Sequence, residues 1–509
     1  MAITSRNLRS WVRKTSGAKP HWHSSARAWG ALSALLAYAL PVAAFANSLP
    51  QSITIGSGTA TDLPRLADDE RAFWASFGDP ELPHLIDLAM AQNPSLQVMR
   101  SRLVEAKSNL KSIRAALKPA VDLAASANLT QGIAGLVPGG ARTASGSLQV
   151  SYELDVSGTN HAKAGAAAAR ISSSASDVQT ARLTTGSEIA RNFILLSSLR
   201  SERAFLEREL QSALKIGTVV AARRAEGESL ALDDGLLAQQ KAGIEADLIS
   251  LAQDEAQLLS ALAVLTGQEP ESFNCETQQL QSLRTLTIDI EQPLELVSQR
   301  PDVKAAEYRL SAERLDAASL RRSILPNVVV SANGVGAMLT SGLGGLFTAG
   351  ASVIASILDG GARKARIAAG NAREDAALAN HRSVLLVSLQ EVAVSLAMLD
   401  GSRRRLRIWE NAVNDSNMAT ASAEHLYIEG AMTIASLIEA RRLELVTVRA
   451  ATSARRDILL ASVDVFRAMG GVPRISTTDQ LFPSHLNQLR TSTDDALASG
   501  QIAGVNVKH

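Results

Sequence analysis

The sequence has one cysteine, few aromatic residues and almost no net charge, and each shortage excludes a class of protein. Cys275 has no second cysteine in its chain, which excludes an intrachain disulfide and a cysteine-based zinc site. Lysine and arginine number 51 against 50 aspartates and glutamates, whereas a nucleic-acid-binding protein needs a clear basic excess. Aromatic residues make up 4% of a chain that is 46% hydrophobic, a bias that favours extended helices over compact mixed domains.

The sequence also lacks the residue patterns of catalysis and of cofactor binding. The histidines are scattered without the spacing of metal ligands. The glycine-rich stretch SGLGGLFTAGAS (341–352) has no Lys-Ser/Thr pair, so it does not predict a phosphate-binding loop. We therefore expect no enzyme activity, no metal and no cofactor.

Prolines are missing from two long stretches, 139–269 and 327–472, which leaves room for very long helices. The segment QNPSLQVMRSRLVEAKSNLKSIRAALKP (92–119) aligns with QRPDVKAAEYRLSAERLDAASLRRSILP (299–326) at an offset of 207. Further on the offset is 203, where RAEGES begins at 224 and YIEGAM at 427. This internal duplication predicts two repeats and the segment that joins them. The first repeat covers 84–267, the linker covers 268–300 and the second repeat covers 301–472.

Within each repeat, hydrophobic residues are spaced alternately three and four apart, a pattern typical of coiled coils. Examples are Ile189, Phe193 and Leu196 in the first repeat and Leu385, Leu389, Val392, Leu396 and Leu399 in the second. Each long helix is followed by a glycine-containing turn, at Gly227 or Gly430, and then by a second helical stretch. The sequence therefore predicts one long antiparallel helical hairpin in each repeat.

Between the helices lie two segments with the two-residue period of β-strands, 120–156 and 326–358. Pro119 lies directly before the first segment and Pro326 begins the second, at equivalent positions of the two repeats, so we interpret these prolines as helix-to-strand junctions. Apolar and polar residues alternate clearly in 120–130 and 147–155. Alternation is weaker in the second repeat, where we expect strands at 327–339 and 346–357 and where the register of the last strand stays open.

Strands of this length can cross a bilayer, and no other predicted sheet or short amphipathic helix is available to cover their apolar faces. Four strands are too few to close a barrel, and open edges in lipid leave backbone groups unpaired. Several chains would have to pool their strands, and three chains would give twelve. The alternative is a half-buried soluble sheet in a secreted scaffold or adhesin. Only Tyr152 and Phe347 could contribute to an aromatic girdle.

The two ends of the sequence have compositions of their own. Residues 1–30 carry basic but no acidic residues, an apolar core follows at 31–40, and Ala44-Phe45-Ala46 resembles a cleavage site, so we expect a signal peptide over 1–46. An uncleaved membrane anchor is the alternative. No cysteine follows the cleavage site, so no lipid anchor is expected there. We expect a periplasmic segment at 47–83 and a polar tail at 473–509.

Several segments together resemble the TolC family of outer-membrane factors, most closely its NodT-like branch. They are FWASFGDPELPHLIDLAMAQNPSLQ (73–97), LSALAVLTG (259–267), RPDVKAAEYRL (300–310), LDGGARKA (358–365) and YIEGAMTIASLIEARRLEL (427–445). The resemblance implies a mostly α-helical homotrimer, with a twelve-stranded barrel in the outer membrane and a long α-barrel in the periplasm. It implies a passive exit duct for drugs or other small molecules, with a periplasmic adaptor and an inner-membrane transporter as partners and outer-membrane lipid around the barrel. A type I duct for protein secretion is the alternative within the family.

The resemblance also implies roles for individual residues. The hairpin ends would dock to the adaptor, and they comprise Glu226, Gly227, Glu228 and Ser229 in the first repeat and Glu429, Gly430, Ala431, Met432 and Thr433 in the second. Ser436 and Glu439 match acidic positions where the duct of the family narrows. Glu439 could therefore contribute one carboxylate to a ring of three, whereas Ser436 departs from the acidic pattern.

Overall fold

The computed structural model describes residues 70–130, 141–226, 231–286, 297–339 and 342–471. These residues belong to one compact unit, Pro64–His509. The expected signal peptide, the start of the expected periplasmic segment and the polar tail lie outside the described residues. So do Gly227, Glu228 and Ser229 of the first hairpin end.

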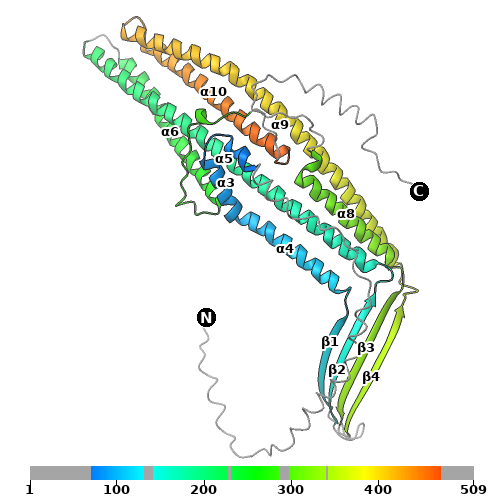
Figure 1. Ribbon diagram of the computed structural model, residues 1–509. Helices are drawn as coiled ribbons and strands as arrows, with labels where there is room; N and C mark the ends of the chain where they lie inside the picture. Colours follow the sequence, from blue (N-terminus) through cyan, green and yellow to red (C-terminus); the bar gives the residue numbers. More distant parts are fainter. Residues whose placement is uncertain (1–69, 131–140, 227–230, 287–296, 340–341, 472–509) are drawn as a thin grey trace, which may run out of the picture. The chain divides into compact units, whose positions relative to one another are not determined.

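Two helices of 67 residues dominate the fold, one in each repeat (Figure 1). At 1.5 Å per residue each is about 100 Å long. Each is preceded by a helix of 22 residues and two strands and is followed by a returning helix of 35 or 36 residues. The first repeat contains α4 (Pro94–Ala115), α5 (Thr159–Ala225) and α6 (Ala231–Thr266), and the second contains α8 (Pro301–Arg322), α9 (Ala362–Ile428) and α10 (Ile434–Ala468).

The long helices begin in the same way after their strands. The Asp155 carboxylate accepts hydrogen bonds from the backbone N–H groups of Asn160 and His161, at 3.0 and 2.8 Å. Asp359 does the same for Gly361 and Arg363, at 3.1 and 2.9 Å. Each aspartate therefore satisfies N–H groups at a helix N-terminus that have no partner within the helix. We expected Asp155 to be the last residue of the strand 147–155, but the strand ends at Leu154 and Asp155 belongs to the junction.

The four strands form one antiparallel sheet in the order β1-β2-β3-β4. Their bounds are Ala120–Thr130, Ala141–Leu154, Asn327–Leu339 and Gly342–Ile354. The last strand begins four residues before, and ends three residues before, the predicted 346–357. The glycine-rich start of β4 belongs to the ladder, because Gly344 and Gly345 pair with Ala337 and Gly336 of β3. Glycine has no side chain to reveal alternation, which is why the prediction missed this part of the strand.

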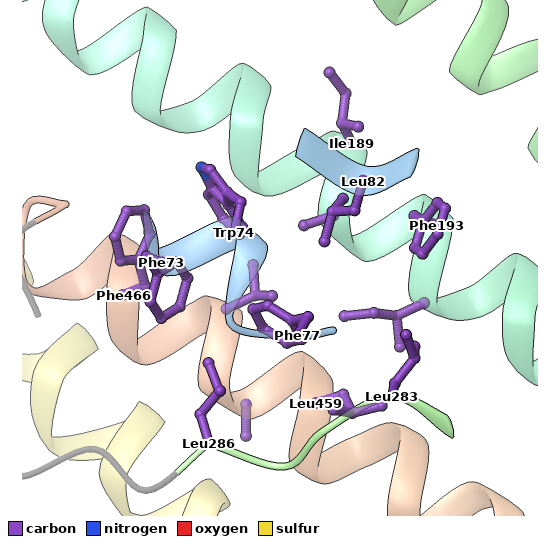
Figure 2. Close-up of a cluster of buried hydrophobic side chains, with 14 of the residues drawn as sticks. Phe73, Trp74, Phe77, Leu82, Ile189, Phe193, Leu283, Leu286, Leu459 and Phe466 are labelled. Carbon is purple, nitrogen blue, oxygen red and sulfur yellow. The ribbon is translucent and has the colours of Figure 1, made fainter. Parts of the chain in front are cut away.

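A hydrophobic core joins both repeats near the middle of the long helices. The Phe73 and Phe466 rings stack with centroids 3.9 Å apart, and Trp74 meets Phe466 edge to face at 4.8 Å (Figure 2). Ile189 and Phe193 of α5 are fully buried in the same core. The segment before α3 (Glu81–Gln92), which includes Phe77, and the segment around Leu283 also contribute to this core. The aromatic residues, although few, are concentrated where the two repeats must be held together.

The predicted coiled-coil positions are buried or partly buried as the spacing indicated. Leu196 of α5 is fully buried, and Val392 and Leu399 of α9 are 4% and 3% exposed. Two described helices, α6 over Leu232–Thr266 and α9, each contain an 18-residue stretch that could cross a membrane by length and composition alone. Helices inside soluble cores meet the same criterion, so this is weak evidence for a membrane span.

Candidate functional site: a two-faced sheet and the paired hairpin ends

The strand register separates the sheet into an apolar and a polar face. On one face Leu123 pairs with Leu148, Leu148 with Gly334, and Gly334 with Phe347. Leu123 is 80% exposed and Phe347 67% exposed, so nothing in the described chain covers this face. Phe347 lies over Gly334, since a Cβ atom added there would be 3.8 Å from the ring. An exposed apolar face on a sheet of this length is what a lipid-facing surface requires.

The opposite face carries polar groups on β1 and β2, and one row of polar groups crosses all four strands, although Val335 of β3 and Leu346 of β4 also lie on this face. One row runs from Asp122 to Gln149, Asn333 and Thr348. Another pairs Ser126 with Ser145, whose hydroxyl oxygens are 2.8 Å apart. Because strand side chains alternate between faces, none of these groups can reach the apolar side. The sheet can therefore separate an apolar surrounding from water.

Pro119 and Pro326 each lie directly before a strand. The backbone leaves the helix at Ala115 or Arg322, passes through a turn, and enters β1 or β3 one residue after the proline. Proline cannot continue a helix and disfavours helical conformation in the residue before it. The structure thus places both prolines between a helix and a strand, at matching points of the two repeats.

The end of the second hairpin is a tight turn from α9 into α10. Gly430 has a positive φ of 79°, which only glycine adopts readily. The Ala431 N–H donates to the Leu426 carbonyl at 2.9 Å and closes the last turn of α9. Thr433 then caps α10, since its hydroxyl oxygen accepts the Ser436 N–H at 3.3 Å. Glu429 and Ala431 are exposed, so this end can meet another molecule.

An arginine of the first hairpin holds the end of the second. Arg223 of α5 donates hydrogen bonds to the carbonyl oxygens of Tyr427 and Ile428, both at 2.8 Å. Its guanidinium carbon is 4.9 Å from the centroid of the Tyr427 ring. Beneath this contact Val220, Tyr427, Ile434 and Leu437 form a small buried cluster. The two hairpin ends are therefore packed together through Arg223.

The residues expected at the constriction have partners on their own helix. The Ser436 hydroxyl lies 3.0 Å from that of Thr433, within the cap of α10. Arg442 donates to both carboxylate oxygens of Glu439, at 2.8 and 2.6 Å. This hydrogen bond lowers the pKa of Glu439 and raises that of Arg442, so both are charged at neutral pH. Their side chains are 53% and 63% exposed.

Sequence reasoning missed Arg441, which lies beside Arg442 but is only 3% exposed. It donates to Glu209 at 3.0 Å and to Ser212 at 2.5 Å on α5, and it pairs with Glu424 on α9. Its position could have been noticed, because an arginine follows Ile434 and Leu437 at the spacing of a coiled-coil core. The buried ion pair between Arg441 and Glu209 therefore links α10 to α5 of the first hairpin.

Burial also raises the pKa values of two other groups, the Glu444 carboxyl and the Cys275 thiol. Burial raises the pKa of Glu444, one turn beyond Arg441, in spite of a hydrogen bond from Thr420. Burial raises the pKa of the Cys275 thiol to about 12, so this thiol is protonated and unreactive at neutral pH. Among the described residues no three histidine, cysteine, aspartate or glutamate side chains converge to hold a metal ion.

Comparison with known proteins extends over most of the chain. The family described as Outer membrane efflux protein matches residues 85–267 and 293–471, together well over half of the sequence. Outer membrane protein OprJ of Pseudomonas aeruginosa is 28% identical over 465 residues, which cover 87% of this chain and 93% of OprJ. The pyoverdine export outer membrane protein OpmQ of the same species is 26% identical and covers 80% and 88%.

Solved structures of membrane proteins also resemble this chain. A membrane protein from Pseudomonas aeruginosa is 26% identical, with a TM-score of 0.71 over 78% of this chain and 95% of that one. The MtrE outer membrane channel of Neisseria gonorrhoeae shares the fold at a TM-score of 0.70. These findings confirm the predicted TolC-like fold, efflux function and outer-membrane location, and they give no support to a secretion duct or an adhesin. The matched family consists of channels and not of enzymes. The chain belongs to the outer membrane efflux protein family.

Proposed function

We propose that three copies of this chain close a twelve-stranded barrel and act as the passive exit duct of a tripartite efflux pump. The observation that carries this proposal is the sheet with an exposed apolar face and two unpaired edges. Within the described residues β1 pairs only with β2, and β4 only with β3. Both edges would be costly in lipid unless β4 of one copy pairs with β1 of the next.

The polar rows of the sheet would then line the duct. Asp122, Gln149 and Asn333 face the side opposite to Leu123 and Phe347, so closure with the apolar face outward turns them inward. The described strands carry no lysine or arginine on this polar face. Water and polar solutes would pass along this lining. The long helices α5 and α9, about 100 Å each, would extend the duct into the periplasm.

The hairpin ends would receive the periplasmic adaptor. Glu429, Gly430, Ala431, Met432 and Thr433 form the described part of this surface, together with Glu226. Gly227, Glu228 and Ser229 complete it in sequence and remain a prediction. Support comes from the exposure of Glu429 and Ala431 on a turn that is rigidly capped at both sides. An inner-membrane transporter, reached through the adaptor, would supply the energy.

Glu439 would line the narrowest part of the duct, with Ser436 one turn closer to the hairpin end. Arg442 would lie at the same level of the duct, because its guanidinium binds both oxygens of the Glu439 carboxylate. Three Glu439 side chains around an axis would then be accompanied by three arginines. The ring would carry much less net negative charge than three carboxylates alone, and we expect only a weak preference for cations.

The cargo would be small molecules. OpmQ is described as a pyoverdine export protein, and two relatives from Pseudomonas putida, ArpC and TtgC, are described as outer membrane proteins of an antibiotic efflux pump and of a toluene efflux pump. These names describe those proteins, and the variety among them supports the broad class of small organic molecules rather than one compound. A duct without its own recognition site would pass whatever the transporter delivers.

Conductance across a planar bilayer tests the proposal. The purified full chain should form stable channels in steps of one size, and addition of the adaptor on the periplasmic side should change their gating. A variant in which Leu123 and Phe347 are both replaced by aspartate should fail to insert, since it places charge on the lipid-facing side. The matched variant with Ser126 and Thr348 replaced by aspartate should still conduct. Conductance by the first variant, or none by wild type, would contradict the proposal.

A further inference from the structure

The antiparallel sheet brings four chain segments to one of its ends. β1 starts, β2 finishes, β3 starts and β4 finishes at this end, and each strand is joined there to a helix. Figure 1 shows α4, α5, α8 and α9 meeting the strands at this common end. The four segments are 111–119, 155–163, 321–326 and 355–366, and we call them the junction collar.

The junction collar is strongly basic although the whole chain is nearly neutral. It contains nine lysines and arginines and only two acidic residues, Asp155 and Asp359. The other end of the sheet has almost no charge, since Arg142 is the single charged residue between 123 and 148, and 329–358 contains none. The excess of positive charge is thus confined to the end from which the helices extend.

The two acidic residues of the collar are already engaged. Asp155 and Asp359 accept the N–H groups that begin α5 and α9, and His161 Nδ1 also lies 2.6 Å from Asp155. Hydrogen bonds from the Arg363 and Gly361 N–H groups lower the pKa of Asp359. Both carboxylates bind the N-termini of helices, and their two negative charges against nine positive ones leave the collar with an excess of seven positive charges.

Several of the basic side chains are exposed and lack an ion-pair partner. Arg321 pairs with Glu374, and Arg363 lies 3.8 Å from Asp359. By contrast, Lys111, Lys118 and Lys364 are exposed and make no ion pair with any residue that the structure describes. They come from α4, from the turn after it and from α9, so free positive charge is present in both repeats.

Exposed apolar side chains accompany these lysines. Ile357 and Leu358, between β4 and α9, are 93% and 94% exposed, and Val156, between β2 and α5, is 74% exposed. They follow the ends of β2 and β4 in the chain. Basic side chains next to exposed aliphatic ones are typical of a protein surface at the boundary between lipid tails and headgroups.

We propose that the junction collar binds anionic phospholipid headgroups in the membrane leaflet on the helix side of the barrel. Lys111, Lys118 and Lys364 would contact the lipid phosphates, while Val156, Ile357 and Leu358 enter the upper part of the acyl chains. The collar would fix the depth of a barrel whose strands offer only Tyr152 and Phe347 as aromatic anchors. This goes beyond the proposed duct, which requires a lipid-facing sheet but no particular lipid.

Lipid binding by the purified full chain tests the proposal. The protein in a neutral detergent is titrated with short-chain phosphatidylglycerol or phosphatidylcholine, and native mass spectrometry counts the bound lipids. The collar variant combines Lys118→Gln with Lys364→Gln, and a second one combines Lys111→Gln with Arg114→Gln. The matched control combines Lys215→Gln, at an exposed lysine of α5, with Lys241→Gln, at a partly buried lysine of α6 that lies 3.6 Å from Glu245. Both lysines lie far along the first hairpin from the sheet.

Wild type and the control should bind phosphatidylglycerol about fivefold or more tightly than phosphatidylcholine, since each surface lysine contributes about that factor toward an anionic membrane. Each collar variant should reduce this preference at least about threefold, and inorganic phosphate at matched ionic strength should not displace the lipid. Equal binding of the two lipids by wild type, unchanged preference in both collar variants, or full displacement by phosphate would overturn the proposal. Channel conductance of the collar variants should stay that of wild type, so a failure here is distinct from a failure of the duct.

Discussion

Arg223 of α5 lies 4.9 Å from the ring centroid of Tyr427 on α9 and donates to the Tyr427 and Ile428 carbonyl oxygens at 2.8 Å. These carbonyls belong to the last turn of α9, where helix carbonyls have no partner within the helix and where positive charge is favourable. The Arg223 guanidinium of the first hairpin thus caps the last turn of α9 and joins the two hairpins. The contact sits next to the Gly430 turn that we propose as adaptor surface.

Replacing Arg223 with alanine should loosen the end of the second hairpin. Two hydrogen bonds from a charged donor and one cation–π contact would be lost, together worth about 2 kcal/mol or more. We expect amide hydrogen exchange at Glu429, Gly430 and Ala431 to speed up at least about tenfold. The control is Arg224→Ala. Arg224 is exposed and its partner Asp234 is in the same hairpin, so this change should leave these amides unchanged. Equal exchange in both variants would contradict this role of Arg223.

Replacing Arg441 with methionine should destabilise the protein strongly. Glu209, Glu424 and Glu444 would remain close together without the buried cation between them, a change that typically costs about 3 to 5 kcal/mol. We expect a clear drop in the midpoint of thermal unfolding in detergent. Arg442→Met, at the next position but exposed, serves as the control and should change the midpoint little. A similar small effect for both would show that the buried network is not important for stability.

Glu439 and Arg442 should act on ion selectivity in opposite directions. Glu439→Gln removes a carboxylate from the proposed ring and should reduce the preference for cations. Arg442→Gln leaves that carboxylate without its counter-charge and should increase the preference, by an amount larger than the Glu439→Gln change. Reversal potentials of single channels in a salt gradient measure both. If neither variant shifts the reversal potential, Glu439 does not line the narrow part of the duct.

Glu444 should make stability depend on pH. Burial raises its folded-state pKa above the ordinary 4.5, opposed by the Thr420 hydrogen bond and by Arg441, while Glu209 and Glu424 add to the rise. Its contribution to stability is therefore complete below about pH 4.5 and is lost as the pH rises through the raised pKa. Glu444→Gln should lack this loss, so its thermal midpoint should fall less than that of wild type between pH 4 and pH 7. Parallel curves for the two proteins would contradict the assignment.

The sequence predicted those parts of the fold that depend on regular spacing. Ile189, Phe193 and Leu196 are buried where the three-and-four pattern placed them, and the alternation of β1 survives in its register. The start of β4 was missed because Gly342, Gly344 and Gly345 carry no side chain from which a face can be inferred. The register of β4 is set by its pairing with β3, and the spacing of residues in the sequence does not reveal that pairing.

The candidate site was less predictable because it depends on contacts between distant segments. Glu439 and Arg442 are three residues apart, a spacing that already favours an ion pair on a helix. Arg223 and Tyr427 are separated by 204 positions, and nothing in either segment indicates that they meet. Arg441 follows Ile434 and Leu437 at the spacing of a coiled-coil core, but nothing in the sequence indicates that Glu209 and Glu424 lie around it.

The number of chains in the membrane-extracted protein tests the central claim most directly. Light scattering of the detergent-solubilised protein, corrected for bound detergent, gives the mass of protein alone. The account predicts three chains per particle, and it predicts that the protein leaves the membrane only when detergent is added. A single chain that stays soluble without detergent would contradict the barrel, and with it the duct.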